Sequence, residues 1–334
     1  MRKKIGKLNI YIDEKIELLG IVQYLSNYGE RYPFLVTIEE NLYTKKVNKY
    51  FESIKGHSVI SKFEELSYDG FDFHIPPEFM LHLNENLDIK NSFDDELLER
   101  SSGIYEAKNF IKLLKNFSST SNFKEFIIEN QIFYDEIIHK FTRIIDGIDY
   151  IKILEEYFGE AKKSYNLIPV PLFSHGNYGI KVKDSDGQEN IYAILAGFHL
   201  EDMLTKELII NLLWHEFSHS FVNHLADVFE DESSTLDVYF KSMDKFISKT
   251  PYNELKYFLG ELIVRAITIR LIYRNISEDL AYEFIKKDKE FGFIHIEELC
   301  NKLKEYEENR EIYKNFKSFY TEILLFLKTL PPVN

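Results

Sequence analysis

Hydrophobic residues recur every three or four positions along most of this chain, which is the spacing of helices with one buried face. Residues 14–28 show this spacing clearly, and Asp13 stands where an N-cap residue is expected. Helical spacing also covers residues 38–67, residues 94–163 as three helices, residues 253–274, and the heavily charged residues 278–330. In residues 71–83, Pro76 and Pro77 predict an extended segment or a turn before any following helix.

Alternation of polar and apolar residues, which is typical of strands, is confined to a few short segments. Residues 7–12 predict a short strand, and residues 164–173, with two prolines, predict an edge strand or an irregular one. Residues 178–198 predict a β-hairpin with a turn at residues 184–187. Residues 191–198 are our candidate for an edge strand, to which an extended peptide substrate could bind as an additional strand. The alternative is that they belong to an ordinary internal hairpin.

Together these patterns predict an α+β fold that is mostly helical. Residues 1–163 form a mainly helical N-terminal region, and residues 164–334 hold a small sheet with an edge hairpin followed by further helices. Because no linker rich in Gly, Ser or Pro separates the two regions, we expect the first to pack on the second as one compound domain.

The segment 205–229 carries the strongest chemical signal, because it contains the sequence His-Glu-Phe-Ser-His within a predicted helix. Thr205 can serve as its N-cap, and no Pro or Gly interrupts it until after Glu230. A polar loop is expected over residues 231–239, then a helix to about residue 248 that Thr250 and Pro251 end.

His215 and His219 are four residues apart and therefore project from one face of the helix, where two imidazoles can bind one Zn²⁺ ion. Glu216 points about 100° away and can reach a water molecule at the metal. The alternative is a buried amphipathic helix with two incidental histidines. Trp214 and Phe217 argue against it, since burying imidazoles and a carboxylate without partners is costly.

A catalytic zinc needs a third protein ligand. The zinc sites with three histidines, of the form H-E-x-x-H-x-x-G-x-x-H, do not match, because Leu225 stands at the position of the third histidine and His224 faces the opposite side of the helix. Glu261 lies in an apolar helical segment and is the main candidate; a simple ion pair with Arg265 is the alternative, and both can hold if Arg265 orients the ligand.

Other candidate ligands are weaker. Asp227 is poorly aimed, whereas the loop acids Asp231 and Asp237 remain as a fallback. His74 and His82 are expected to be surface or core residues rather than ligands.

The composition limits the classes of partner that we expect for this protein. The 334-residue chain has a net charge of −14, so a nucleic-acid partner is disfavoured. The single cysteine, Cys300, excludes an intramolecular disulfide. No apolar stretch is long enough to be a signal peptide core or a membrane span, so we expect a cytoplasmic protein; a secreted chain whose leader has been removed would have the same features.

The segments HEFSHSFVN and GELIVRAITIRL resemble the glutamate zincins, metallopeptidases with an H-E-x-x-H helix and a glutamate on a later helix. More narrowly, with DEKIELLGIVQYL and YEENREIYKNF, the chain resembles an uncharacterised bacterial family with an HEFSHSFVNP motif. This resemblance implies a zincin-like catalytic region with His215, His219 and Glu261 as ligands and Glu216 as base. His224 replaces the family's usual Pro, and Arg265 stands where well-studied glutamate zincins often have Asp.

We therefore expect a zinc-dependent peptidase that hydrolyses a peptide or protein substrate, with Glu216 moving the proton from water to the leaving amine. His175, Tyr239, Tyr252 and Arg265 are candidate donors to the developing oxyanion. The alternative is a non-catalytic protein that binds a peptide or holds a structural zinc.

Overall fold

The protein has an α+β fold that is mostly helical and contains one mixed five-stranded sheet, as the sequence predicts. The computed structural model describes residues 2–196, 205–243 and 254–331. The chain forms two compact units, and each contains segments distant in sequence. The first unit comprises Met1–Gly147 and Lys162–Ile209, and the second comprises Ile148–Ala161 and Ile210–Asn334.

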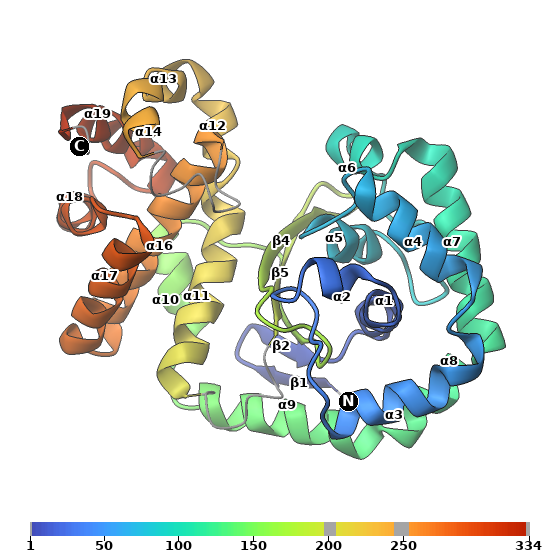
Figure 1. Cartoon of the computed structure of the whole chain (residues 1–334). Coiled ribbons are helices and arrows are strands. Elements are labelled where there is room, and N and C mark those ends of the chain that lie inside the picture. Colours follow the sequence, from blue (N-terminus) through green and yellow to red (C-terminus); the bar gives the residue numbers. More distant parts are fainter. Residues whose placement is uncertain (1, 197–204, 244–253, 332–334) are drawn as a thin grey trace. The chain divides into compact units, whose positions relative to one another are not determined.

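The first unit carries the sheet and the helices that cover it (Figure 1). Its elements are β1 (Arg2–Ile5), β2 (Leu8–Tyr11), α1 (Glu14–Leu25), α2 (Tyr28–Arg31), α3 (Leu42–Phe51), η1 (Glu52–Ile54), α4 (Ser58–Tyr68), α5 (Ile75–Leu81), α6 (Asp95–Arg100), α7 (Gly103–Thr120), α8 (Phe123–Glu129), α9 (Gln131–Ile145), β3 (Ser164–Pro169), β4 (Tyr178–Lys183) and β5 (Glu189–Leu195).

The strand order is β1-β2-β3-β5-β4, with β2, β3 and β5 parallel and the two outer pairs antiparallel. The prediction that residues 164–173 form an edge or irregular strand is wrong, because β3 lies in the middle of the sheet. Its first proline, Pro169, is the last residue of the strand, so the ladder donors of the preceding residues are intact. The prediction of an edge strand at residues 191–198 is also wrong: β5 pairs on both sides, and residues 197–198 lie outside the described residues.

The predicted hairpin is confirmed, and its edge strand is β4. Asp184 forms the turn, because its Oδ1 accepts hydrogen bonds from the backbone N–H groups of Asp186 and Gln188 at 2.9 and 3.0 Å. Gly187 adopts a left-handed φ of +73°, which the turn requires and glycine provides without strain.

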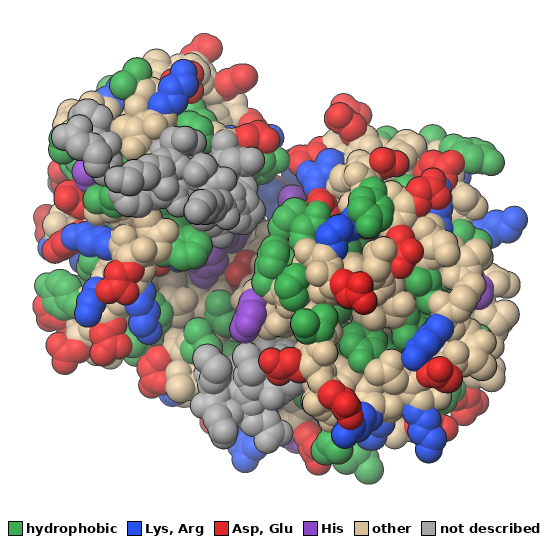
Figure 2. All heavy atoms as spheres, in the orientation of Figure 1, with side chains coloured by type: hydrophobic (Ala, Val, Ile, Leu, Met, Phe, Trp, Pro, Cys, Tyr) green, Lys and Arg blue, Asp and Glu red, His purple; other side chains and the backbone are tan. Residues whose placement is uncertain are grey.

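One large hydrophobic core fills the first unit, where the helices around α1 pack on Ile168, Ile180 and Ile194 of the sheet. Helix α1 begins at the predicted N-cap, since Asp13 accepts hydrogen bonds from the backbone N–H groups of Lys15 and Ile16. Acidic and basic side chains are interspersed over the face of the molecule shown in Figure 2.

Two further sequence predictions, one of which extends into the second unit, need correction. Pro76 and Pro77 do not impose an extended segment; they lie in the first turn of α5, where a missing N–H leaves no helical hydrogen bond unmade. Residues 94–163 form five helices rather than three. Ser102 and Asn122 have left-handed φ values of 58° and 52° between consecutive helices and so divide the long helical pattern.

The second unit is helical. Its elements are α10 (Tyr150–Phe158), most of α11 (Lys206–Val222), α12 (Leu225–Val228), α13 (Glu230–Ser234), α14 (Asp237–Ser242), α16 (Leu255–Asn275), α17 (Glu278–Phe291), α18 (Ile296–Glu308), η3 (Phe316–Phe319) and α19 (Tyr320–Thr329).

Helix α16 is central to the second unit, because its residues are buried nearly all the way round and it packs against α17 and α18 (Figure 1). The predicted polar loop at residues 231–239 is wrong in part. Acidic residues in the first turn of α13 favour a helix, and Leu236 and Tyr239 are buried. The predicted continuation to residue 248 and its end at Thr250 and Pro251 fall largely outside the described residues. Among the described helices, none has the length and apolar character that a membrane span requires.

Candidate metal centre

Helix α11 presents the two histidines of the H-E-x-x-H sequence on one face. Its start is the predicted one, since the Thr205 hydroxyl accepts a hydrogen bond from the backbone N–H of Leu208 at 3.2 Å. The Nε2 atoms of His215 and His219 lie 3.2 Å apart, and each side chain is 15% exposed. Trp214 is fully buried beside them, and its indole N–H donates to the carbonyl of Tyr150 at 3.1 Å. This anchoring fixes the rotation of the helix and therefore the direction of the histidines.

Helix α16 brings Glu261 to the two imidazoles. Glu261 Oε1 lies 3.6 Å from His215 Nε2, and Glu261 Oε2 lies 3.5 Å from His219 Nε2. Among the described residues, these three side chains form the one set whose possible ligand atoms come together in this way, all within 4.8 Å of one another. We call His215, His219 and Glu261 the three-ligand group.

The separations within the three-ligand group fit a tetrahedral ion. Ligand atoms placed about 2.1 Å from a common centre at tetrahedral angles are about 3.4 Å from one another. The two Nε2 atoms are 3.2 Å apart and Glu261 Oε2 is 3.5 Å from His219 Nε2, both close to that value, while the 3.6 Å contact with His215 Nε2 is made by the other carboxylate oxygen, Oε1. Nitrogen and carboxylate donors of this kind suit Zn²⁺, so the residues present fit the metal that the sequence suggests.

Electrostatics hold His215 and Glu261 in the protonation states that a cation needs. Burial lowers the pKa of His215 to about 3, so its imidazole is neutral at physiological pH. Burial alone would raise the pKa of Glu261, but the Arg265 guanidinium and the two imidazoles together outweigh it, and the pKa falls to about 2. The carboxylate is therefore charged and the imidazole is not.

Arg265 and Glu261 also form the ion pair that was the alternative to metal binding. Arg265 Nε donates to Glu261 Oε1 at 2.6 Å, and its Nη1 donates to Asp288 Oδ1 at 2.5 Å. The guanidinium lies 4.7 Å from the centre of the Phe293 ring, which holds it by a cation–π contact. The two geometries coexist, because the ion pair uses Oε1 while Oε2 faces His219.

Two neighbours of this group were missed in the sequence. Asn223 Oδ1 lies 3.0 Å from His219 Nδ1, and Asp288 belongs to α17, the helix that follows α16. Asn223 was detectable, since it follows His219 by four residues and therefore shares its helix face. Asp288 had no local signal, because only the packing of α17 against α16 brings it near Arg265.

Glu216, the proposed base, follows His215 on α11 and is 5% exposed. Tyr239 is buried in the second unit, whereas His175 belongs to the first unit and Tyr252 lies outside the described residues. Asp227, Asp231 and Asp237 are exposed, and none of these acids joins the three-ligand group among the described residues; neither does His74, His82 or His224.

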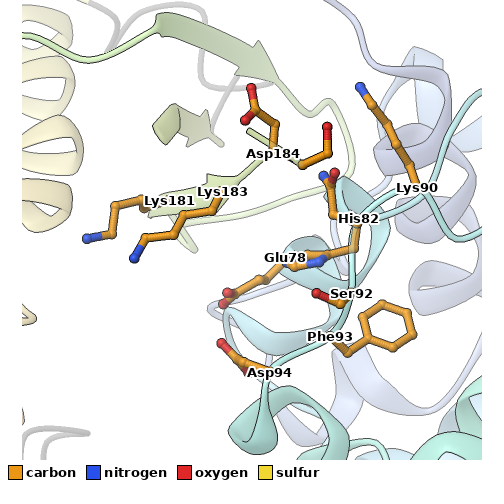
Figure 3. A pocket seen from close by; sticks show the side chains of 11 residues that line it. Glu78, His82, Lys90, Ser92, Phe93, Asp94, Lys181, Lys183 and Asp184 are labelled. Carbon is orange, nitrogen blue, oxygen red and sulfur yellow. The ribbon is translucent and has the colours of Figure 1, made fainter. Parts of the chain in front are cut away.

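His82 instead lines a pocket of about 600 Å³ within the first unit. Figure 3 shows His82 and Glu78 on the side of α5, with Lys181 and Lys183 of β4 opposite. Burial, reinforced by nearby acidic side chains, raises the pKa of Glu78 to about 8. The groups in this pocket do not converge as a set of three metal ligands, so the candidate metal centre is the one in the second unit.

Fold and site together define an α+β protein with a candidate centre of two histidines and one glutamate on two helices. The chain belongs to the family described as "Domain of unknown function (DUF4932)", whose pattern matches residues 8–326. Membership in a family of unknown function agrees with the second, narrower resemblance drawn from the sequence. No curated protein and no solved structure matches the chain.

Proposed function

We propose that this protein is a zinc-dependent peptidase and that the three-ligand group holds its metal. The observation that carries the proposal is the convergence of three side chains. The two imidazole Nε2 atoms are 3.2 Å apart, and the two carboxylate oxygens of Glu261 lie 3.5 and 3.6 Å from them, close to the separation expected around one tetrahedral ion. The H-E-x-x-H sequence, with a glutamate on a later helix, is the arrangement of the glutamate zincins and supports the peptidase class.

Exposure of the histidines favours a catalytic rather than a structural site. Structural zinc sites are closed by four protein ligands, whereas catalytic sites keep one position open. Here three candidate ligand side chains converge, and both imidazoles remain 15% exposed to solvent. When bound, zinc acts as a Lewis acid that polarises a carbonyl group and makes water nucleophilic near neutral pH.

The residues of the chain supply the remaining steps. Glu216 follows a ligand histidine on α11, so its carboxylate is the base that takes the proton from the attacking water. The same carboxyl then delivers that proton to the leaving amine, which leaves Glu216 ionised for the next cycle. Arg265 and Asn223 hold the ligands and take no part in proton transfer.

The test is the substitution Glu216→Gln, which preserves shape and removes the base. We expect this variant to bind zinc at a near-unit ratio and to lose roughly 10²–10⁴ in the rate of peptide cleavage, the usual scale for general-base catalysis. Cleavage is measured by mass spectrometry on a mixture of peptides prepared from denatured proteins. Glu207→Gln is the matched control, because Glu207 is exposed in the first turn of the same helix.

Full activity in Glu216→Gln, or equal losses in both variants, contradicts the assigned base. The competing function is a protein that binds peptide or structural zinc without cutting. The observation in its favour is that Arg265 already neutralises Glu261, so the buried carboxylate does not need a metal. A zinc-loaded chain that cleaves nothing in the peptide mixture supports this second function.

A further inference from the structure

We propose that Asn223 and Asp288 are positioning residues that prepare His219 and Glu261 to bind a divalent transition-metal cation. This inference rests on the proposed function only in that the three-ligand group binds metal. It assigns roles to two side chains outside that group, each in hydrogen-bond contact with a ligand or with the arginine that holds one.

Asn223 selects the form of His219 that can bind metal. An amide oxygen only accepts hydrogen bonds, so the 3.0 Å contact of Asn223 Oδ1 requires a proton on His219 Nδ1. In a neutral imidazole the other nitrogen, Nε2, then carries the lone pair. That atom is the one facing His215 and Glu261. The opposite tautomer would direct an N–H into the site and oppose a cation there.

Gly260 makes room for this contact. A Cβ atom at residue 260 would lie 3.0 Å from Asn223 Oδ1, which is closer than most such contacts. A glycine in the middle of a helix costs about 0.5–1 kcal/mol relative to alanine, so its place beside Glu261 has a packing reason. The glycine on α16 and the asparagine at the end of α11 therefore act together.

Asp288 fixes the arginine that holds the third ligand. Arg265 is bound at two points, by Glu261 Oε1 at 2.6 Å and by Asp288 Oδ1 at 2.5 Å. Asp288 is 8% exposed, so its charge acts with little screening by water. It offsets the guanidinium charge, which would otherwise repel a cation, and it limits the pull of Arg265 on the Glu261 carboxylate. Oε2 is then left for the metal.

The test is the affinity of the full-length chain for Zn²⁺, measured by competition with a chromophoric chelator. Removal of residues that orient metal ligands typically lowers metal affinity 10–100-fold. We expect this loss for Asn223→Ala, Gly260→Ala and Asp288→Asn. Asn223→Asp retains an acceptor and should bind zinc at least as tightly as the unsubstituted chain. Asp279→Asn is the matched control, since Asp279 is exposed on α17.

Two further readouts separate positioning from stability. Unfolding of the metal-free variants in urea, followed by Trp214 fluorescence, should show that Asn223→Ala remains folded where its zinc affinity is measured. The visible spectrum of the Co²⁺ form should change in Asn223→Ala and return in Asn223→Asp. If zinc affinity and the cobalt spectrum stay unchanged in both Asn223→Ala and Asp288→Asn, this inference is overturned while the proposed metal site stands. If the unsubstituted chain binds no zinc, both proposals are overturned.

Discussion

Glu17 should make the stability of the first unit fall as pH rises. This side chain of α1 is 1% exposed, and its Oε1 accepts a hydrogen bond from the Tyr43 hydroxyl. Tyr134 completes the cluster, with its hydroxyl 2.7 Å from that of Tyr43 and 3.4 Å from Glu17 Oε1. Burial raises the pKa of Glu17 to about 7, although both tyrosine hydrogen bonds oppose the shift. The folded state therefore prefers the protonated carboxyl.

The sign and the size of the change in stability with pH follow from the difference between the pKa of Glu17 in the folded chain and its pKa in the unfolded chain. Between the unfolded value of 4.5 and the folded value of about 7, the folded state binds more protons, so stability is lost as pH rises through that window. At 1.36 kcal/mol for each pH unit, Glu17 should lower the free energy of unfolding by about 2 kcal/mol between pH 5.5 and pH 8. Glu17→Gln keeps a neutral side chain of the same shape and should remove this contribution.

Hydrogen exchange of the buried amides in α1 measures the effect after correction for the intrinsic exchange rate. The quantity to compare is the change in opening free energy with pH in Glu17→Gln and in the unsubstituted chain, since other groups also titrate. Glu14→Gln is the control, because Glu14 is exposed in the same helix. If Glu17→Gln shows the same pH dependence as the unsubstituted chain, the buried carboxyl is not protonated in the way we infer.

Three other predictions concern the second unit, whose urea unfolding is reported by the only tryptophan of the chain. Gly159→Ala should lower the stability of this unit by more than about 2 kcal/mol, because φ is +67° and a Cβ would lie 2.2 Å from a backbone carbonyl oxygen. Gly56→Ala in the first unit, where a Cβ would meet open space, should leave the tryptophan transition unchanged. Glu307→Gln should lower the free energy of unfolding by about 3 kcal/mol, because it breaks the 2.5 Å ion pair and leaves the Arg270 guanidinium buried without its charged partner. Replacing Arg270 by Met and Glu307 by Leu together should recover most of this loss, and equal stability of the single and double variants would contradict the prediction. Zinc at a hundred times its dissociation constant should raise the free energy of unfolding by about 2.7 kcal/mol. This increase should be absent when a chelator removes the zinc, and absent in the His219→Ala variant.

The sequence predicts those parts of the fold that depend on local chemistry. Asp13 and Thr205 both cap helices as expected, since capping needs only a side-chain oxygen and the next few backbone N–H groups. The Asp184 turn is likewise a local hydrogen-bond pattern. The meeting of Glu261 with the histidines could be anticipated, because a buried carboxylate in an apolar helix requires a partner.

The wrong predictions concern features that tertiary structure decides. Whether a strand such as β3 lies at the edge or the centre depends on which other strands reach it, and β2 comes from the opposite end of the first unit's sequence. The sequence pattern predicts a break at Pro76 because it does not show where α5 begins. Asp288 lay outside every sequence motif, since its contact with Arg265 spans two helices. Local sequence patterns therefore predict which face of a helix or strand a side chain lies on, whereas tertiary packing determines which residues it contacts.

Within the described part of the chain, no strand pairs with the outer side of β1 or of β4, which has a consequence for how copies of the chain behave in concentrated solution. An unpaired strand invites pairing with a second molecule, and proteins commonly deter this with lysines along the border. Both outer strands follow that practice: β1 reads Arg-Lys-Lys-Ile, and β4 carries Lys181 and Lys183. Although the chain as a whole is strongly acidic, the basic residues of β1 and the exposed Lys183 of β4 place positive charge at these borders, where it opposes pairing with a second molecule.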